Sequence, residues 1–200
     1  MASLPTTYHL LSTLVEEDYL HKDRRTYTLT TKISELSEAF ERQRQPAAGL
    51  QAAMRRVAQI TGETAYVSTW SHGDVSIVAV AEGTRTVRVA GVMVGLRGSA
   101  NARASGKVLL AFGPPLRLEK YLHSTLERLT PRTICDPDEL RAALEVVRED
   151  GYAVDIEEFT IGVCCVAVPV IEKGYAVSAL TVSLPFERFD AARDELIDVL

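Results

Sequence analysis

Two apolar segments separated by a tight turn indicate the fold class of this chain. Residues 162–170 have the sequence GVCCVAVPV, residues 175–184 have the sequence YAVSALTVSL, and Lys173-Gly174 lies between them. Runs rich in β-branched residues on both sides of a glycine-containing turn are typical of paired antiparallel strands. The two segments therefore predict neighbouring strands of an antiparallel sheet.

Alternation along the strands predicts which side chains share a face, because successive residues of a strand point to opposite sides. Three strands each place two candidate ligand-binding side chains on one face: Asp155 and Glu157, Val163 and Cys165, and Thr181 and Ser183. A mostly apolar face with a carboxylate and two hydroxyls suits a small polar ligand. A solvated sheet edge is the alternative, which spacing alone slightly favours.

The segments around these strands predict an α+β domain. From Thr64 to Val94 the chain is rich in β-branched residues, with a turn at 72–74, and a further short strand is expected at 152–156. Asp136 is expected to cap a helix that has Pro137 in its first turn and ends at Gly151. Other helices are expected near 48–60, 104–112, 115–123 and 190–200.

The N-terminal segment has its own pattern. An amphipathic helix is expected at 6–17, followed by short strands at Tyr19–Lys22 and Thr26–Leu29. Another helix starts after Thr30 or Thr31 and is interrupted by proline, glycine and polar residues up to Gly49. The predicted boundaries are 1–30 for the helix and hairpin, 31–45 for a linker helix and 46–200 for the main domain.

Composition excludes several classes of protein. The chain has 200 residues, 46% hydrophobic, and a formal net charge of −5, so any contact with DNA must be local. Three cysteines do not make a disulfide scaffold. No apolar run approaches the roughly 20 residues of a spanning helix, and no secretory signal is visible, so a cytoplasmic location with no membrane contact is expected.

Catalytic patterns are weak. The four histidines are scattered and no Cys-x-x-Cys occurs, so no metal or other cofactor is predicted. Gly106-Lys107 lacks the following Ser or Thr and the upstream glycine of a phosphate loop. Cys165 is possible as a nucleophile, but a cysteine on a buried strand is usually an inert small hydrophobe. The sequence does not predict an enzyme.

Ligand binding is better supported at the segment ARASGKVLLA, residues 102–111, where small residues lead into a helix. A carboxylate could sit on the amides of Ala104 and Ser105, with a further bond from the Ser105 hydroxyl, because a helix N-terminus favours an anion. Tight packing of the small residues on the sheet explains the segment equally well.

The N-terminal helix and hairpin could form the recognition helix and wing of a DNA-binding unit. Helix side chains would reach the groove edges, and the hairpin tip would contact phosphate. The candidates are Thr6, Thr7, His9, Arg24 and Arg25. The alternative is an α/β appendage with a solvated turn.

Four blocks in order give a resemblance to a known family. They are ASGKVLLA at 104–111, TPRTI at 130–134, GYAVDIEE at 151–158 and GVCCVAVPV at 162–170. Because these four blocks occur in this order, the chain resembles the IclR family of bacterial transcription regulators over nearly its whole length. Residues 6–29 resemble the end of that family's winged helix-turn-helix, and the helices that precede it in the family are expected to be missing here.

The resemblance implies a GAF-like effector-binding domain over 46–200 and a homodimer or tetramer that acts on a palindromic operator. Ser105 would hold a ligand carboxylate, Asp155 would accept a bond from a hydroxyl, and Val163 and Cys165 would form an apolar wall. The full set of effector contacts implied is Ala104, Ser105, Asp155, Val163, Cys165, Thr181 and Ser183. The alternative function is a sensor module that does not bind DNA by itself.

Overall fold

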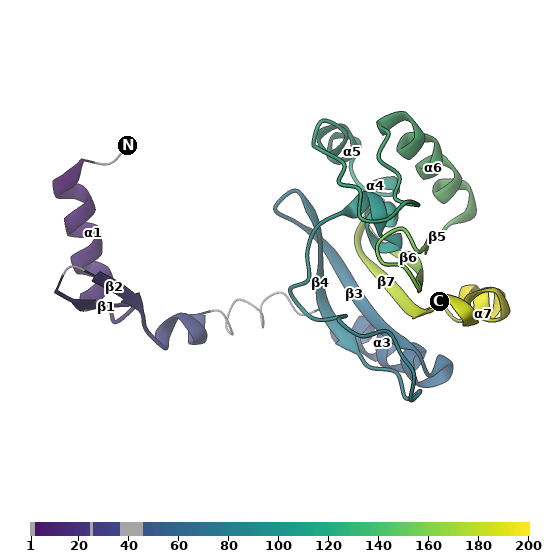
Figure 1. Ribbon diagram of the computed structural model, residues 1–200, viewed down its shortest axis with the longest axis horizontal. Coiled ribbons are helices and arrows are strands. Elements are labelled where there is room, and N and C mark those ends of the chain that lie inside the picture. The colour runs from purple at the N-terminus through teal and green to yellow at the C-terminus, as the bar shows by residue number, and fades with distance from the viewer. Residues whose placement is uncertain (1–2, 25, 37–45) are drawn as a thin grey trace. The chain divides into compact units, whose positions relative to one another are not determined.

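The computed structural model describes residues 3–24, 26–36 and 46–200 (Figure 1). The chain divides into two compact units, residues 1–45 and residues 46–200. Among the described residues, no helix is both long and apolar enough to cross a membrane.

The smaller unit contains helix α1 (Leu4–Glu16) and a hairpin of β1 (Leu20–Asp23) and β2 (Thr26–Leu29). The helix starts two residues before the predicted position because Ser3 caps it and accepts a hydrogen bond from the Thr6 amide at 3.3 Å. Residues 32–36 are helical where the linker helix was predicted, and 37–45 lie outside the described residues.

The larger unit is built on a five-stranded antiparallel sheet of order β4-β3-β7-β6-β5. Its central pair is the one that the sequence predicts, with Cys165 opposite Ser183 and Ala167 opposite Thr181. The five strands are β3 (Thr64–Ser71), β4 (Asp74–Ala81), β5 (Ala153–Ile156), β6 (Val163–Glu172) and β7 (Tyr175–Pro185).

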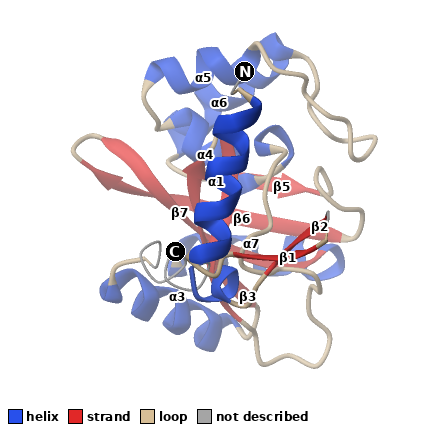
Figure 2. Ribbon diagram, turned by 90° about the vertical axis from the view of Figure 1, so that its left-hand side faces the viewer, coloured by secondary structure: helices blue, strands red, loops and turns tan. Residues whose placement is uncertain are grey.

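Helices cover both faces of this sheet, which gives three layers (Figures 1 and 2). One face carries α3 (Ala48–Thr61) and α7 (Phe186–Val199). The other face carries α4 (Ala104–Ala111), preceded by the short helix η1 (Ala100–Ala102), together with α5 (Pro115–Leu122) and α6 (Pro137–Asp150). The unit is therefore an α+β domain with an antiparallel sheet, as predicted.

Strand alternation divides the core between the two faces. Cys164, Val166 and Val182 pack on the side of α3 and α7, and Cys165 and Ala167 pack on the side of α4. Each layer of helices buries its own apolar cluster, because both faces of the sheet are covered. The predicted facing of β6 is therefore confirmed.

Helix ends follow the predicted capping chemistry. The Asp136 carboxylate accepts hydrogen bonds from the amides of Asp138 and Glu139, both at 2.9 Å, and Pro137 occupies the first turn of α6. Gly151 ends this helix at φ 83°, a left-handed conformation that glycine adopts without steric cost.

The strand prediction is wrong beyond β4. Residues 82–99 form a long loop with no strand, although the isolated bridge between Ser76 and Arg97 brings its end back to β4. Gly91 and Gly95 have φ values of 80° and 88°, which interrupt an extended backbone. The final helix also begins at Phe186, four residues earlier than expected.

Candidate functional site

A cavity of about 70 Å³ lies on the α4 side of the sheet. The loop 82–99 contributes Val89, Ala90, Gly91, Val92 and Leu96 to its lining. The rest of the lining comes from the strands, the start of α4 and the loop after β5: Tyr66, Ile77, Arg103, Asp155, Phe159, Thr160, Val163, Cys165 and Ser183. An apolar wall with a few convergent polar groups is typical of small-molecule sites.

Four of the seven predicted effector contacts meet in this cavity: Asp155, Val163, Cys165 and Ser183. They come from three consecutive strands, β5, β6 and β7, and the antiparallel pairing of these strands brings them together. The sheet face chosen from alternation therefore lines a cavity rather than a solvated edge.

The other three predicted contacts, Ala104, Ser105 and Thr181, are fully buried but do not line the cavity. The hydroxyls of Ser105 and Thr181 have no hydrogen-bond partner among the described residues. At Gly106 an added Cβ would lie 2.3 Å from the Ala100 carbonyl oxygen, so α4 packs directly on η1. The small residues of this segment serve tight packing, which is the alternative that the sequence left open.

Asp155 is the buried carboxyl group of the cavity, with 1% of its surface exposed. One of its oxygens accepts hydrogen bonds from the amides of Glu158 and Phe159, at 2.8 and 3.3 Å. Burial raises the pKa of Asp155 to about 7, although the Lys107 ammonium opposes this shift. Near neutral pH this group can therefore accept or donate a hydrogen bond to a ligand.

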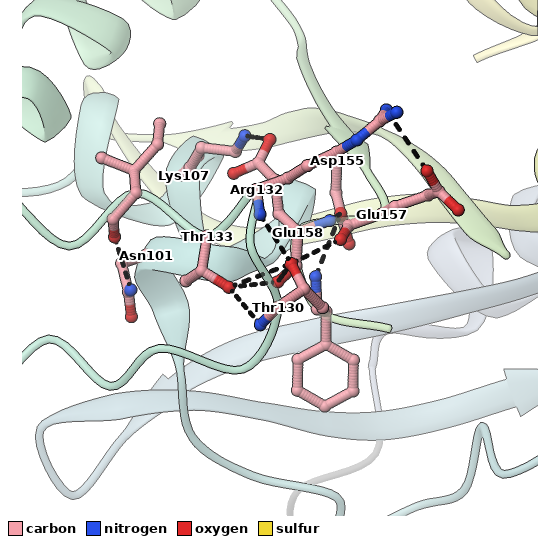
Figure 3. Close-up of polar contacts among 10 residues, drawn as sticks. Asn101, Lys107, Thr130, Arg132, Thr133, Asp155, Glu157 and Glu158 are labelled. Atoms are coloured by element: carbon pink, nitrogen blue, oxygen red, sulfur yellow. Dashed lines mark hydrogen bonds and ion pairs between the residues drawn. The ribbon is translucent and has the colours of Figure 1, made fainter. Parts of the chain in front are cut away.

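The loop after β5 carries Phe159 and Thr160 to the cavity, and two family blocks hold it in place (Figure 3). Lys107 and Glu158 form a buried ion pair of 2.6 Å. The Thr133 hydroxyl donates to the Glu158 carbonyl oxygen at 2.6 Å, and the Thr130 hydroxyl donates to the Glu157 carbonyl oxygen at 2.7 Å. The Gly-Lys helix and the TPRT turn thus position the cavity wall.

Glu157 does not share a strand face with Asp155, which corrects the prediction. Its φ of 57° takes the backbone out of the extended conformation directly after β5. Its carboxylate instead accepts from the Gly162 amide at 2.7 Å and pairs with Arg132 at 3.3 Å. Glu157 closes the loop and leaves Asp155 as the carboxyl group of this strand in the cavity.

Cys165 belongs to a short polar chain across the cavity wall. The Tyr66 hydroxyl lies 3.7 Å from its sulfur, and the sulfur lies 3.5 Å from the Ser183 hydroxyl. Burial raises the pKa of the Cys165 thiol to about 12. The thiol therefore stays protonated near neutral pH and is not a nucleophile, because attack requires the thiolate.

Sequence reasoning missed Arg103, which among the described residues is the one cationic side chain in the cavity lining. Only 3% of its surface is exposed, and its guanidinium carbon lies 3.9 Å from the centre of the Phe159 ring. The available signal was a lone arginine between Ala102 and Ala104, in a segment otherwise made of small residues. Neighbouring small residues drew attention to the backbone instead.

The DNA-binding candidates lie in the smaller unit. Thr6, Thr7 and His9 are exposed on α1, and Arg24 is exposed beside the hairpin turn with φ of 51°. Arg25 lies outside the described residues. No described part of the chain gathers three or more His, Cys, Asp or Glu side chains that could hold a metal ion.

Comparisons with known proteins agree with this architecture. The chain is 38% identical over 142 residues to the HTH-type transcriptional regulator BhcR of Paracoccus denitrificans, which covers 70% of this chain and 50% of that protein. It is 29% identical over 197 residues to the HTH-type transcriptional regulator KdgR of Escherichia coli, covering 96% of this chain and 74% of KdgR. These relatives are transcriptional regulators, not enzymes.

The fold is also that of a crystal structure of the Thermotoga maritima IclR protein. The TM-score is 0.78 at 29% identity, and the match covers 99% of this chain and 81% of that one. Residues 25–200 match the family described as bacterial transcriptional regulator IclR, C-terminal. The chain therefore belongs to the IclR family of bacterial transcriptional regulators.

Proposed function

We propose that this chain is a transcriptional regulator in which a small organic acid or a related metabolite binds the unit 46–200 and controls binding to an operator. The observation that carries this proposal is the cavity, whose walls are positioned by the residues of the family blocks. Of the effector contacts that we propose from the sequence, Asp155, Val163, Cys165 and Ser183 line this cavity, whereas Ala104, Ser105 and Thr181 are buried without lining it.

In the same proposal, α1 is the recognition helix and the β1–β2 hairpin is the wing of a partial winged helix. Thr6, Thr7 and His9 would reach base edges, and Arg24 with Arg25 would contact phosphate. The described residues of these candidates are exposed, as such contacts require. A dimer, or a tetramer of paired dimers, would present two such units to a palindromic operator.

The segment 31–45 would couple the two sites in this proposal. An effector can change operator affinity only if it stabilises one of two arrangements of the chain over the other. A linker helix between the units, together with the GAF-like domain as effector sensor, provides such an element.

A sensor module without DNA binding of its own is the second candidate. One observation favours it: helix α1 has the sequence LPTTYHLLSTLVE and contains no lysine or arginine. Contacts to the phosphate backbone supply much of the affinity of DNA-binding proteins, and they come mainly from these two residues.

Gel shift with DNA from upstream of the chain's own gene tests the first function against the second. Specific retardation that a bound metabolite changes, and that the triple variant Thr6→Ala, Thr7→Ala, His9→Ala abolishes, is the expected result. A matched control is Arg141→Met, an exposed substitution in the other unit. Absence of specific retardation for the wild-type chain would exclude the first function and favour the sensor.

A further inference from the structure

The cavity contains a positive charge with which no carboxylate of the described residues forms an ion pair. Arg103 lines the cavity and is almost completely buried, with 3% of its surface exposed. Its Nε and Nη2 atoms have no hydrogen-bond partner, and it forms no ion pair with a carboxylate of the described residues. Its guanidinium carbon lies over the Phe159 ring, 3.9 Å from the ring centre.

The nearest acidic groups are already engaged elsewhere. An Asp74 oxygen accepts from the amides of Val75 and Ala100, at 2.7 and 3.1 Å. One Asp155 oxygen accepts from the amides of Glu158 and Phe159, at 2.8 and 3.3 Å. The charges of Asp74 and Asp155 act on Arg103 without a hydrogen bond or ion pair to it.

The remaining polar groups of the cavity neutralise only part of the charge of Arg103. Burial raises the pKa of Asp155 to about 7 and the pKa of Cys165 to about 12, and it raises the pKa of Tyr66 well above its ordinary value. The tyrosine and the thiol are therefore uncharged near neutral pH, and Asp155 is partly protonated. An arginine remains protonated in proteins, so a net positive charge stays in the cavity.

An unpaired buried charge destabilises the folded chain, so a ligand that pairs with this charge is favoured. Removing a guanidinium from water without a counter-ion destabilises a fold, and a planar carboxylate that accepts two parallel N–H bonds offsets that destabilisation. Contact with the Phe159 ring face also fixes the plane of the guanidinium before a ligand arrives.

The size of the cavity limits the ligand. One water needs about 10–15 Å³ on this scale, so 70 Å³ holds about five to seven non-hydrogen atoms. Apolar side chains such as Ile77, Leu96 and Val163 form part of the wall, while Asp155 and Ser183 offer hydrogen bonds.

We propose that Arg103 is the anion receptor of this chain and that the effector is a short carboxylate, held by its carboxylate group against the guanidinium. This inference rests on the proposed function, because only that function makes the bound ligand an effector. It adds the chemical class of the ligand that the cavity binds. It assigns to Arg103 the role that the sequence suggested for Ser105, because Ser105 does not line the cavity.

A matched pair of probes tests the class of ligand on the wild-type chain. Lactate and lactamide have nearly the same shape, but only lactate carries a carboxylate. Isothermal titration calorimetry is expected to detect lactate and to show binding of lactamide at least about tenfold weaker, since charge-assisted hydrogen bonds are lost. Equal affinity for the two probes, or no binding of lactate, propionate or glycolate, would overturn the proposal.

Two further probes test selectivity. Inorganic phosphate is expected to bind much more weakly than lactate, because it carries more charge and four oxygens that need polar partners into a largely apolar cavity. Octanoate is expected to bind more weakly because its chain exceeds the space available. Phosphate or octanoate binding as tightly as lactate would overturn the assignment to short carboxylates.

Variants test the role of Arg103 itself. Arg103→Met keeps an unbranched apolar stem and removes the guanidinium and its charge, so lactate affinity should fall at least about tenfold while lactamide affinity changes little. Arg103→Lys should give an intermediate affinity because the charge is kept and the two-bond fork is lost. Arg141→Met removes one charge from an exposed site and should bind lactate as the wild type does.

The outcomes separate this inference from the proposed function. If Arg103→Met does not fold, the lactate and lactamide comparison still decides the question on the wild-type chain. Lactate binding that depends on Arg103 but leaves operator binding unchanged would refute the regulatory function and support the anion site. Lactate affinity unchanged in a folded Arg103→Met chain would refute the anion site alone.

Discussion

At the scale of single residues, the buried position of Asp155 disfavours the ionised form of its carboxyl group. Its carboxyl group is buried at the end of β5, and burial raises its pKa from 3.8 to about 7. The two amide bonds from Glu158 and Phe159 and the charge of Lys107 oppose this shift but do not cancel it. Such perturbed carboxyl groups concentrate at functional sites, which agrees with its place in the cavity.

Asp155→Asn should change how stability depends on pH. Between pH 3.8 and about 7 the folded chain holds a proton that the unfolded chain has lost, so the free energy of unfolding falls as pH rises through this window. Asparagine does not titrate. In the variant, the fall in the free energy of unfolding between low and high pH should therefore be smaller than in the wild type, by on the order of a few kcal/mol. Urea unfolding at about pH 5 and about pH 8 measures the difference.

Glu158→Gln is the companion variant for that experiment, since burial also raises the pKa of Glu158. The decline of stability with pH should therefore shrink in Asp155→Asn without vanishing, and the double variant should flatten it further. An identical pH slope in wild type and Asp155→Asn would show that the carboxyl group of Asp155 titrates normally.

Lys107→Met should strongly destabilise the larger unit. The side chains of Lys107 and Glu158 are only 6% and 12% exposed, so loss of the ammonium leaves a buried carboxylate unpaired. Breaking such a pair from one side costs about 3–5 kcal/mol. Adding Glu158→Gln should restore part of that loss, as measured by chemical denaturation. A double variant no more stable than Lys107→Met would contradict this account.

At the scale of elements, the contact between α4 and η1 depends on the absence of one side chain. A Cβ at Gly106 would lie 2.3 Å from the Ala100 carbonyl oxygen and 2.4 Å from its Cα. Both atoms belong to the backbone, so one helix must move away from the other. This close approach also brings Arg103, which lies between the two helices, to the cavity.

Gly106→Ala should therefore lower the free energy of unfolding by about 2–3 kcal/mol, as overpacking in a core does. Gly49→Ala is the matched control, because nothing lies within 4 Å of an added Cβ in the first turn of α3. That change should be neutral or stabilising by up to about 1 kcal/mol. Equal effects of the two substitutions in thermal denaturation would contradict the role given to Gly106.

At the scale of the whole molecule, the chain forms two compact units. The sheet, both helical layers and every residue that lines the cavity belong to 46–200. In the smaller unit, helix α1 has no buried residue. The larger unit thus contains its own core and its own candidate site, and its stability should not depend on the smaller one.

A fragment of residues 46–200 should therefore fold and bind as the full chain does. We expect one cooperative transition by differential scanning calorimetry, with a Tm within a few degrees of the main transition of the full chain. Its affinity for lactate should also match. An unfolded fragment, or one with a much lower Tm, would show that residues 1–45 contribute to the core.

Much of the fold could be predicted because it depends on local chemistry. Asp136 and Gly151 mark the ends of α6 through hydrogen bonds and backbone angles within a few residues. Alternation in β6 separates Cys164 from Cys165 because the side-chain period of a strand is two. Such features need no knowledge of distant residues.

The candidate site could be predicted only in part. Asp155, Val163, Cys165 and Ser183 follow from strand alternation, and the structure confirms that they share one cavity. The sequence predicts strand up to Val94 because β-branched residues such as Val87 and Val94 favour that conformation, but Gly91 and Gly95 have positive φ and residues 82–99 form a loop. Its contribution to the cavity wall has no periodic signal in the sequence.

The sequence by itself determined the antiparallel pairing of residues 162–184, the ends of α6 and which side chains of β6 share a face, because each depends on spacing between near neighbours. Only the tertiary structure decided that Ser105 packs inside the core while Arg103 reaches the cavity. The direction of a side chain at the start of α4 depends on how η1, the sheet and the loop after β5 pack around it. Those contacts join residues that the sequence holds far apart.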